Sequence, residues 1–193
     1  MYHNSLVALT FVAVATFIHV CSMEHTWERG HRHYMDNDFK LYDVVHSNTP
    51  DMSMYSQVKD FYALLFLVPI FLSPPPGDFY REFFIKQSVL VIIRSIMIFC
   101  TVLPKGKQCT RENKTLINSC YDKIFSGHFS FGLLITLLLF KYGVLQNTET
   151  NYITFAILNV FHFFILTVTR SHYTIDTLVS LFMTLFVFGL NGN

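Results

Sequence analysis

The sequence has few charged residues and no long run of charge of one sign. Only 14% of its 193 residues are charged, and the formal net charge is +1 at pH 7. Without a basic stripe or a block of like charges to follow a phosphate backbone, a nucleic-acid-binding protein is disfavoured. The chain also has no internal repeat and no low-complexity linker, so we expect one domain over residues 1–193.

Apolar residues, in contrast, are abundant and grouped. Hydrophobic residues make up 52% of the chain, and the mean hydropathy is +0.39. They gather in blocks close to the length that a bilayer crossing needs, about 20 residues. We therefore predict an all-α integral membrane bundle of six transmembrane helices, at roughly residues 5–22, 55–73, 83–104, 129–146, 152–169 and 173–190. The second is the weakest, because Pro69 and the run Pro74–Pro76 interrupt or end it.

Two short polar segments lie at the N-termini of predicted helices. Ser126–His128 precedes the fourth helix, and His172–Asp176 opens the sixth. The loops before these two helices are the third and the fifth between the six predicted spans. Odd-numbered loops all lie on one side of the membrane, so His128 and His172 are expected on the same side. The polar stretch Met23–Asp60, predicted to be a loop, opens on that side too and can cover the site.

His172 and Asp176 are four residues apart. On a helix this spacing puts both on one face, with the carboxylate able to accept the imidazole N–H. Such a pair is typical of an activated nucleophile or base, and with a second imidazole at a helix mouth it suits phosphate-ester chemistry on lipids. A lone histidine in an apolar segment is more often a core residue, which is our interpretation of His19 and His162.

Three segments resemble motifs of the sphingomyelin synthase family. Cys120–His128 resembles the family's Cys-Gly-Asp, three residues, Ser-Gly-His. His172–Val179 resembles His-Tyr-Thr/Ser-x-Asp-Val, and Arg94–Pro104 resembles a segment of Arg, a hydrophobic helix and Thr-x-Leu-Pro. The segments occur in the family's order, and the resemblance covers about residues 5–190.

The resemblance implies a fold shared with type 2 phosphatidic acid phosphatases and a His-His-Asp catalytic triad. His172 would attack the phosphorus of a phospholipid headgroup, and Asp176 would stabilise the imidazolium. His128 would protonate the departing diacylglycerol and then take the proton of the ceramide primary hydroxyl. The implied partners are a membrane phospholipid donor and a ceramide acceptor, with no cofactor and no metal. Choline, ethanolamine and inositol headgroups all stay open, as does a homo-oligomer.

Arg94 is the main candidate for substrate binding outside the triad. It lies near the middle of the third predicted span, where a charge costs about 2.5 to 3.5 kcal/mol on insertion scales. We therefore expect it to face the bundle and to pair with an acid or with the lipid phosphate. Asp122 has a comparable role or shapes its loop. The full set of candidate substrate-binding residues is Arg94, Asp122, Ser126, Gly127 and Tyr173.

The cysteines and one sequon bear on orientation. Cys109 and Cys120 bracket a loop that carries the glycosylation sequon Asn113–Thr115. A disulfide between them and a glycan on Asn113 would both require a lumenal or extracellular face. The basic residues of the odd loops favour the cytosol by the positive-inside rule. We side with the sequon, the cysteine pair and the family, and expect a Golgi or plasma membrane protein. Cys21 and Cys100 lie in apolar segments and are expected to be free thiols.

Three other interpretations fit parts of the sequence. His25, His31, His33 and His46 suggest a metal site, but a loop with no fixed ligand geometry favours solvated histidines. A lipid phosphate phosphatase would use the same triad with water as acceptor, although its usual motif of Lys, six residues, Arg-Pro is missing. A non-catalytic membrane scaffold or transporter would make the triad accidental.

Overall fold

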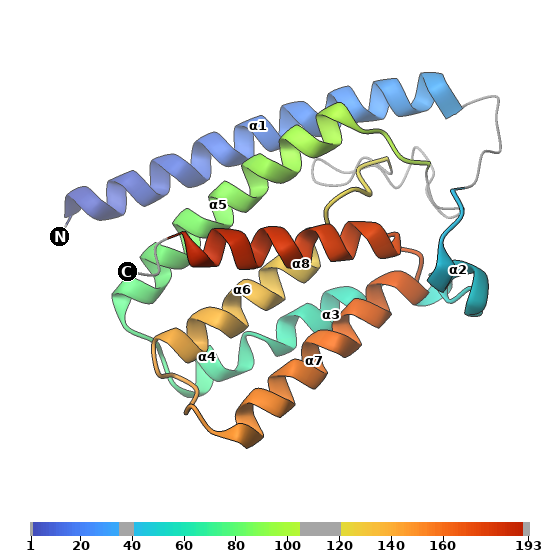
Figure 1. The fold of residues 1–193 in the computed structure, drawn as a ribbon. Helices are drawn as coiled ribbons and strands as arrows, with labels where there is room; N and C mark the ends of the chain where they lie inside the picture. The colour runs from blue at the N-terminus through green and yellow to red at the C-terminus, as the bar shows by residue number, and fades with distance from the viewer. Residues whose placement is uncertain (1, 35–40, 105–120, 191–193) are drawn as a thin grey trace.

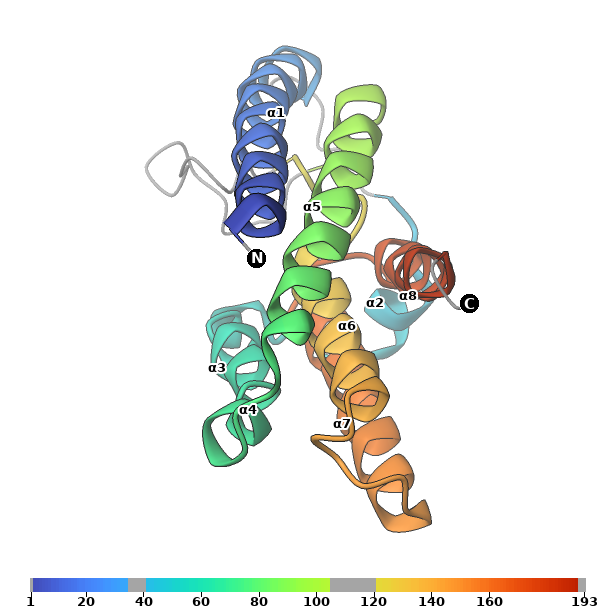
Figure 2. The ribbon, with the colours of Figure 1, turned by 90° about the vertical axis from the view of Figure 1, so that its left-hand side faces the viewer.

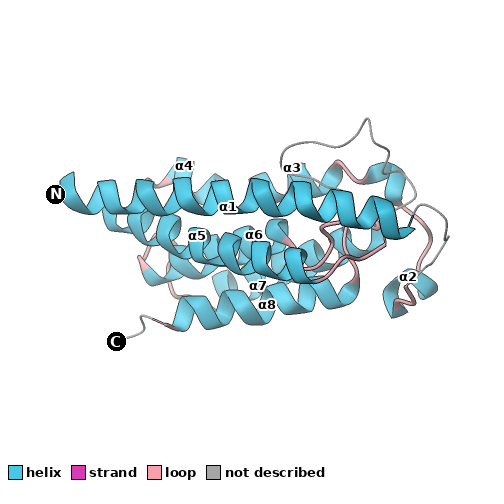
Figure 3. Ribbon diagram, turned by 90° about the horizontal axis from the view of Figure 1, so that it is seen from above, coloured by secondary structure: helices cyan, strands magenta, loops and turns pink. Residues whose placement is uncertain are grey.

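The computed structural model describes residues 2–34, 41–104 and 121–190, which form a bundle of helices (Figures 1 and 3). Within these ranges there are eight α-helices, one 3-10 helix and no strand, so the all-α prediction is confirmed. The elements are α1 (Tyr2–Tyr34), α2 (Val44–Asn48), η1 (Ser53–Tyr55), α3 (Val58–Leu65), α4 (Val68–Leu72), α5 (Gly77–Cys100), α6 (Gly127–Lys141), α7 (Glu149–Val168) and α8 (Thr174–Gly189).

Helix α6 lies at the centre of the bundle, where it contacts α3, α5, α7 and α8 (Figure 2). Close approach to α6 depends on a small residue. A Cβ at Gly132 would lie 2.9 Å from the ring of Phe66 and 3.2 Å from Nδ1 of His162. Small residues allow such close packing between helices in a membrane, where apolar burial alone does not drive association. Helix α1 packs along α5 at the outside of the bundle (Figure 1).

The helix ends that the odd-numbered loops join lie at one end of the bundle. The last turns of α1, α5 and α7 and the first turns of α3, α6 and α8 lie toward that end, away from the start of α1 and the end of α8 (Figure 1). His128 belongs to the first turn of α6, and His172 stands just before α8. The two histidines are therefore at the same end, as the alternation of the helices predicted.

The prediction that Met23–Asp60 forms a loop was wrong for its first part, because α1 continues to Tyr34. Two polar side chains of this part bind the neighbouring helix and the chain that follows it, while others, such as Glu24 and His33, are exposed. The Thr26 hydroxyl donates to the Ile98 carbonyl (3.0 Å), and the Tyr34 hydroxyl donates to the Val102 carbonyl (3.1 Å).

The second predicted span is not one helix but the sequence η1, α3 and α4. Helix α3 ends at Leu65 and α4 begins at Val68. Pro69 explains the break, since it has no N–H to donate to the carbonyl of Leu65 and its ring would crowd that carbonyl.

Three helices are long and apolar enough to cross a membrane: Leu6–Tyr34 of α1, Gly77–Cys100 and Glu149–Val168. Helices α6 and α8 are apolar but have only 15 and 16 residues, which is less than the ~20 that a full crossing needs. These long apolar helices are those of an integral membrane protein, and the count of six spans stays a prediction.

Candidate active site

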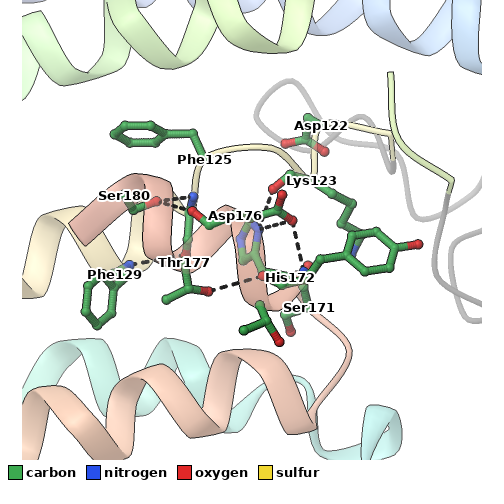
Figure 4. Close-up of polar contacts among 12 residues, drawn as sticks. Asp122, Lys123, Phe125, Phe129, Ser171, His172, Asp176, Thr177 and Ser180 are labelled. Atoms are coloured by element: carbon green, nitrogen blue, oxygen red, sulfur yellow. Dashed lines mark hydrogen bonds and ion pairs between the residues drawn. The ribbon is translucent and has the colours of Figure 1, made fainter. Parts of the chain in front are cut away.

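The segment before α6 is fixed by Ser126, which is fully buried. Its hydroxyl caps α6 by accepting the N–H of Phe129 (3.3 Å). Its own N–H donates to the Ser180 hydroxyl (2.5 Å), so the start of α6 is pinned to α8 (Figure 4). These bonds direct the Ser126 side chain toward the protein interior and place His128, two residues later, in the first turn of α6.

His172 is held by a different group from the one that the sequence predicted. Helix α8 begins at Thr174, so His172 lies outside it and helical spacing to Asp176 does not apply. Its Nδ1 is 3.8 Å from Oδ2 of Asp176, which is too far for a hydrogen bond. The Nδ1–H donates instead to the carbonyl of Lys123 (2.7 Å; Figure 4). The expected direct bond from His172 to the Asp176 carboxylate is therefore absent.

Asp176 is a buried carboxylate in the first turn of α8. Its Oδ2 accepts the N–H of Tyr173 (2.9 Å), and its Oδ1 has no hydrogen-bond partner among the described residues. At 3.8 Å from the His172 ring, the carboxylate is close enough to stabilise a positive charge that develops there.

His128 pairs with Asp60, a residue that the sequence did not single out. The imidazole Nε2–H donates to Asp60 Oδ1 (2.7 Å), and Asp60 lies in the first turn of α3. Burial lowers the pKa of His128 to about 4, and a positive charge on the nearby His172 would lower it further, whereas Asp60 raises it. The only sequence signal for Asp60 was its position at the end of the first odd-numbered loop, on the side where the histidines lie.

The surroundings of His172 keep its ring neutral. Burial lowers the pKa of His172 below its ordinary 6.5, and the nearby Lys123 ammonium lowers it further. Because Nδ1 donates its proton to a carbonyl, which can only accept, the second ring nitrogen Nε2 carries the lone pair. A neutral imidazole with a free Nε2 is the form that can attack phosphorus.

Arg94 pairs with an acid, as its place in an apolar helix required. Its Nη2 donates to Oδ2 of Asp122 (2.5 Å), and its Nε donates to the carbonyl of Phe125 (3.1 Å). On the other side Nη1 donates to Nε2 of His19 (2.6 Å). Burial would raise the pKa of Asp122, but the Arg94 charge lowers it. Arg94 therefore links α1 and α5 to the loop that leads to His128.

The first loop covers the site, as its position predicted. The His46 Nε2–H donates to the carbonyl of His172 (3.1 Å), and the rings of His46 and Tyr173 lie 5.2 Å apart. Arg170 donates to the carbonyl of Thr49 (2.7 Å). These contacts place α2 against the turn between α7 and α8 (Figure 1).

The remaining candidate residues have varied surroundings. Tyr173 is half-buried, its hydroxyl donates to the Pro104 carbonyl (3.4 Å), and burial together with the Asp176 charge raises its pKa to about 12. Gly127 lies against Arg94, where a Cβ would be 3.8 Å from Nε, so the space itself does not demand glycine. Within the described ranges no group of three or more His, Cys, Asp or Glu side chains is placed to hold a metal.

The structure describes only some of the cysteines, and it does not describe the glycosylation sequon. Cys109, Asn113 and Cys120 lie outside the described residues, so the disulfide and the glycan stay predictions. Cys21 and Cys100 are free thiols, as predicted.

The fold and the site together define a helical membrane protein with a paired-histidine site at one end of the bundle. Residues 119–193 match the PAP2 superfamily C-terminal domain, a segment that includes His128, His172 and Asp176 and is less than half of the chain. No curated protein matches the chain. The family match supports phosphatase-type or phosphotransferase-type chemistry on lipid phosphates, and it does not distinguish a sphingomyelin synthase within that superfamily.

Proposed function

We propose that this protein transfers a phosphate-bearing headgroup from a membrane glycerophospholipid to the primary hydroxyl of ceramide, through a phosphohistidine on His172. The observation that carries the proposal is the pair of histidines at one end of the bundle, each with one ring nitrogen held by the protein. His172 Nδ1 is held by Lys123, and His128 Nε2 is held by Asp60. Among the described residues the other nitrogen of each ring makes no hydrogen bond, so it is available for the reaction.

In the first step, His172 Nε2 forms a bond to the phosphorus while the bond from phosphorus to the diacylglycerol oxygen breaks. The protonated form of His128, a minor and strongly acidic form because burial lowers the pKa of the ring to about 4, gives a proton from Nδ1 to that oxygen, and Asp60 favours this charged form. The Asp176 carboxylate balances the positive charge that develops on His172. Diacylglycerol then leaves into the bilayer.

In the second step, the ceramide hydroxyl gives its proton to His128 and its oxygen attacks the phosphorus, which breaks the bond to His172 Nε2. Both histidines return to their starting states. Water must be excluded while the phosphohistidine exists, because hydrolysis would turn a transferase into a phosphatase. The cover that α2 forms over the His172 main chain supports this requirement.

A transfer assay on the purified full chain in mixed micelles tests the proposal. Fluorescent ceramide is supplied with phosphatidylcholine, phosphatidylethanolamine or phosphatidylinositol in separate reactions. We expect a headgroup-bearing ceramide in at least one reaction, its loss in His172→Ala, and its retention in His33→Ala, a substitution of an exposed histidine of α1. Release of a free phospho-headgroup or phosphate without ceramide product would identify a hydrolase, and inactivity in every reaction would favour a non-catalytic role.

We also propose that the site faces the lumen or the cell exterior, in the Golgi or plasma membrane. Two of the basic residues that favour the cytosol, Lys123 and Arg170, donate to main-chain carbonyls near the site, so their positions also have a structural reason. Expression in eukaryotic cells tests the orientation. A glycosidase-sensitive mass shift that Asn113→Gln abolishes is the expected result, and an unshifted protein whose loops are labelled only from the cytosol would reverse it.

A further inference from the structure

Lys123 contacts the nucleophile's segment through both its main chain and its side chain. Its carbonyl accepts the Nδ1–H of His172 (2.7 Å), and its ammonium donates to the carbonyl of Ser171 (2.6 Å) and, more weakly, to that of Arg170 (3.4 Å; Figure 4). One residue of the loop before α6 therefore holds both the ring and the backbone that carries it.

The carbonyl of Lys123 is itself fixed on both sides. Arg94 donates to the carbonyl of Asp122 (3.4 Å) and to that of Phe125 (3.1 Å), which anchors the loop before and after Lys123. A main-chain carbonyl accepts and never donates, so it selects the tautomer with hydrogen on Nδ1. The Asp176 carboxylate is too far away to make that selection, at 3.8 Å.

The turn that the ammonium contacts needs support. Arg170 has a positive φ of 58° although it is not glycine, a conformation that carries a cost for a side chain with a Cβ. Helix α7 ends at Val168, and carbonyls beyond a helix end lack partners within the helix. A partly buried cation such as Lys123 is favourable at such a position, both as a donor and through the helix dipole.

We propose that Lys123 is a positioning residue for the nucleophile, with its carbonyl fixing the tautomer of His172 and its ammonium fixing the turn from Arg170 to Ser171. The inference rests on the proposed role of His172. It extends the proposed function, because the sequence resemblance assigns no role to Lys123.

The charge of Lys123 has a second effect that can be measured. Ionisable groups facing His172 come from the loop before α6 and from α2, α5, α6, α7 and α8; they are Lys123, Asp122, His46, Arg94, His128, His162 and Asp176. After burial, the Lys123 charge is the largest influence that lowers the pKa of His172. Removing that charge should therefore raise this pKa and move the acid limb of the kcat/KM profile to higher pH.

The test compares Lys123→Met, which removes charge and donor, with Lys123→Gln, which keeps a donor, and Lys123→Arg, which keeps the charge. Lys141→Met is the matched control, because it removes a lysine ion pair with Glu82 elsewhere in the bundle. We expect Lys123→Met to lower kcat by about 10- to 100-fold, as a small misplacement of a reacting group can, with little change in the KM of the donor lipid.

The acid limb should move to higher pH in Lys123→Met and Lys123→Gln and stay in place in Lys123→Arg and Lys141→Met. If Lys123→Met does not fold, Lys123→Gln alone decides the shift. A wild-type kcat and acid limb in a folded Lys123→Met or Lys123→Gln protein would overturn the proposal, and so would an equal shift in Lys141→Met.

Trapping the intermediate separates this inference from the proposed function. The protein is incubated with donor lipid that carries a radioactive phosphate, without ceramide, and the protein-bound label is measured. A base-stable, acid-labile label on the wild type supports the proposed phosphohistidine. Slower formation of this label in Lys123→Gln supports the role of Lys123 as well. No such label on the wild type, with His172→Ala fully active, would remove His172 as nucleophile whatever Lys123 does. Equal labelling rates in the wild type and Lys123→Gln would contradict the role of Lys123 alone.

Discussion

The carboxylate of Asp43 binds both the N–H (2.6 Å) and the hydroxyl (2.8 Å) of Thr174, the first residue of α8. Asp43 also caps α2 by accepting the N–H of His46 (3.0 Å). One side chain of the first loop therefore caps two helices, and one of these carries Asp176. The cover over the site and the helix beneath it are held together at this residue.

Asp43→Ala should loosen this junction. Loss of an N-cap costs about 0.5–2 kcal/mol, so we expect a lower apparent melting temperature in detergent and a lower transfer rate. Asp51→Ala is a control for another side-chain cap in the same loop, where Asp51 accepts the N–H of Ser53. Equal melting temperatures for the wild type and Asp43→Ala would contradict a structural role for the junction.

The contribution of Asp43 should depend on pH. Burial would raise its pKa, but hydrogen bonds from His46 and Thr174 lower it below the ordinary 3.8. The stabilisation is then complete above that ordinary value and is lost as pH falls through the lower value of the folded state. The melting difference between the wild type and Asp43→Ala should accordingly shrink only in strong acid. A difference that already disappears near neutral pH would show that Asp43 is not the group involved.

The pair of His128 and Asp60 leads to a second prediction. Asp60→Asn keeps the shape of the side chain and removes the negative charge that stabilises the imidazolium. General acid catalysis contributes typically 10²–10⁴-fold to the rate. Because Asp60→Asn keeps the His128 ring and changes only its partner, we expect a smaller loss, about 10- to 100-fold in kcat.

Asp78→Asn is the control for Asp60, since Asp78 pairs with Arg81 in the first turn of α5 and makes no described contact with the histidines. Steady-state kinetics on both variants, with melting curves to verify folding, provide the measurement. A kcat within twofold of the wild type in Asp60→Asn would mean that His128 does not need this carboxylate.

Much of the arrangement follows from the sequence, and the part that does not has a physical reason. Alternating helices fix the shared end of His128 and His172, because each helix reverses the direction of the chain. The cost of a charge in an apolar helix predicts an acid for Arg94, and Asp122 supplies it.

Local spacing cannot reveal contacts between distant segments. The partner of His172 Nδ1 is a main-chain carbonyl, which every residue has, so no side-chain pattern marks Lys123. Asp60 pairs with a histidine that follows 68 residues later in the chain. The spacing of His172 and Asp176 suggested a direct bond only on the assumption that both lie within α8, and that helix begins at Thr174.

His162 allows a test of the interpretation that it is a core residue. Its ring is fully buried against Tyr62, Phe66 and Phe129, and neither ring nitrogen has a hydrogen-bond partner among the described residues. A buried polar group without a partner costs about 1–3 kcal/mol. His162→Leu should therefore raise the apparent melting temperature. It should leave transfer activity within about twofold, since the ring nitrogens that it removes make no hydrogen bond among the described residues.

Gly132→Ala is the opposing variant, because its methyl group would press on the ring of Phe66 and on His162. We expect it to lower the melting temperature. If His162→Leu instead lowers both stability and activity, His162 takes part in a polar network of the working enzyme and is not a core residue.

Arg94 distinguishes a substrate-binding residue from one that organises the site. If it binds the lipid phosphate, Arg94→Gln should raise the KM of the donor strongly. The three groups that it contacts, Asp122, Phe125 and His19, predict the other result. Loss of Arg94 leaves the Asp122 carboxylate buried without its cation, and removing one partner of a buried pair costs about 3–5 kcal/mol. We expect a large fall in melting temperature and in kcat, with the KM of the donor nearly unchanged.

A double-mutant cycle with Asp122→Asn completes the test. Because the two side chains form one ion pair (2.5 Å), the second substitution should cost much less than the first, and the melting data should show a coupling energy. Additive losses would mean that the pair is not a unit. A donor KM that rises in Arg94→Gln but not in Asp122→Asn would assign Arg94 to the phosphate, and the loop before His128 would then need another anchor.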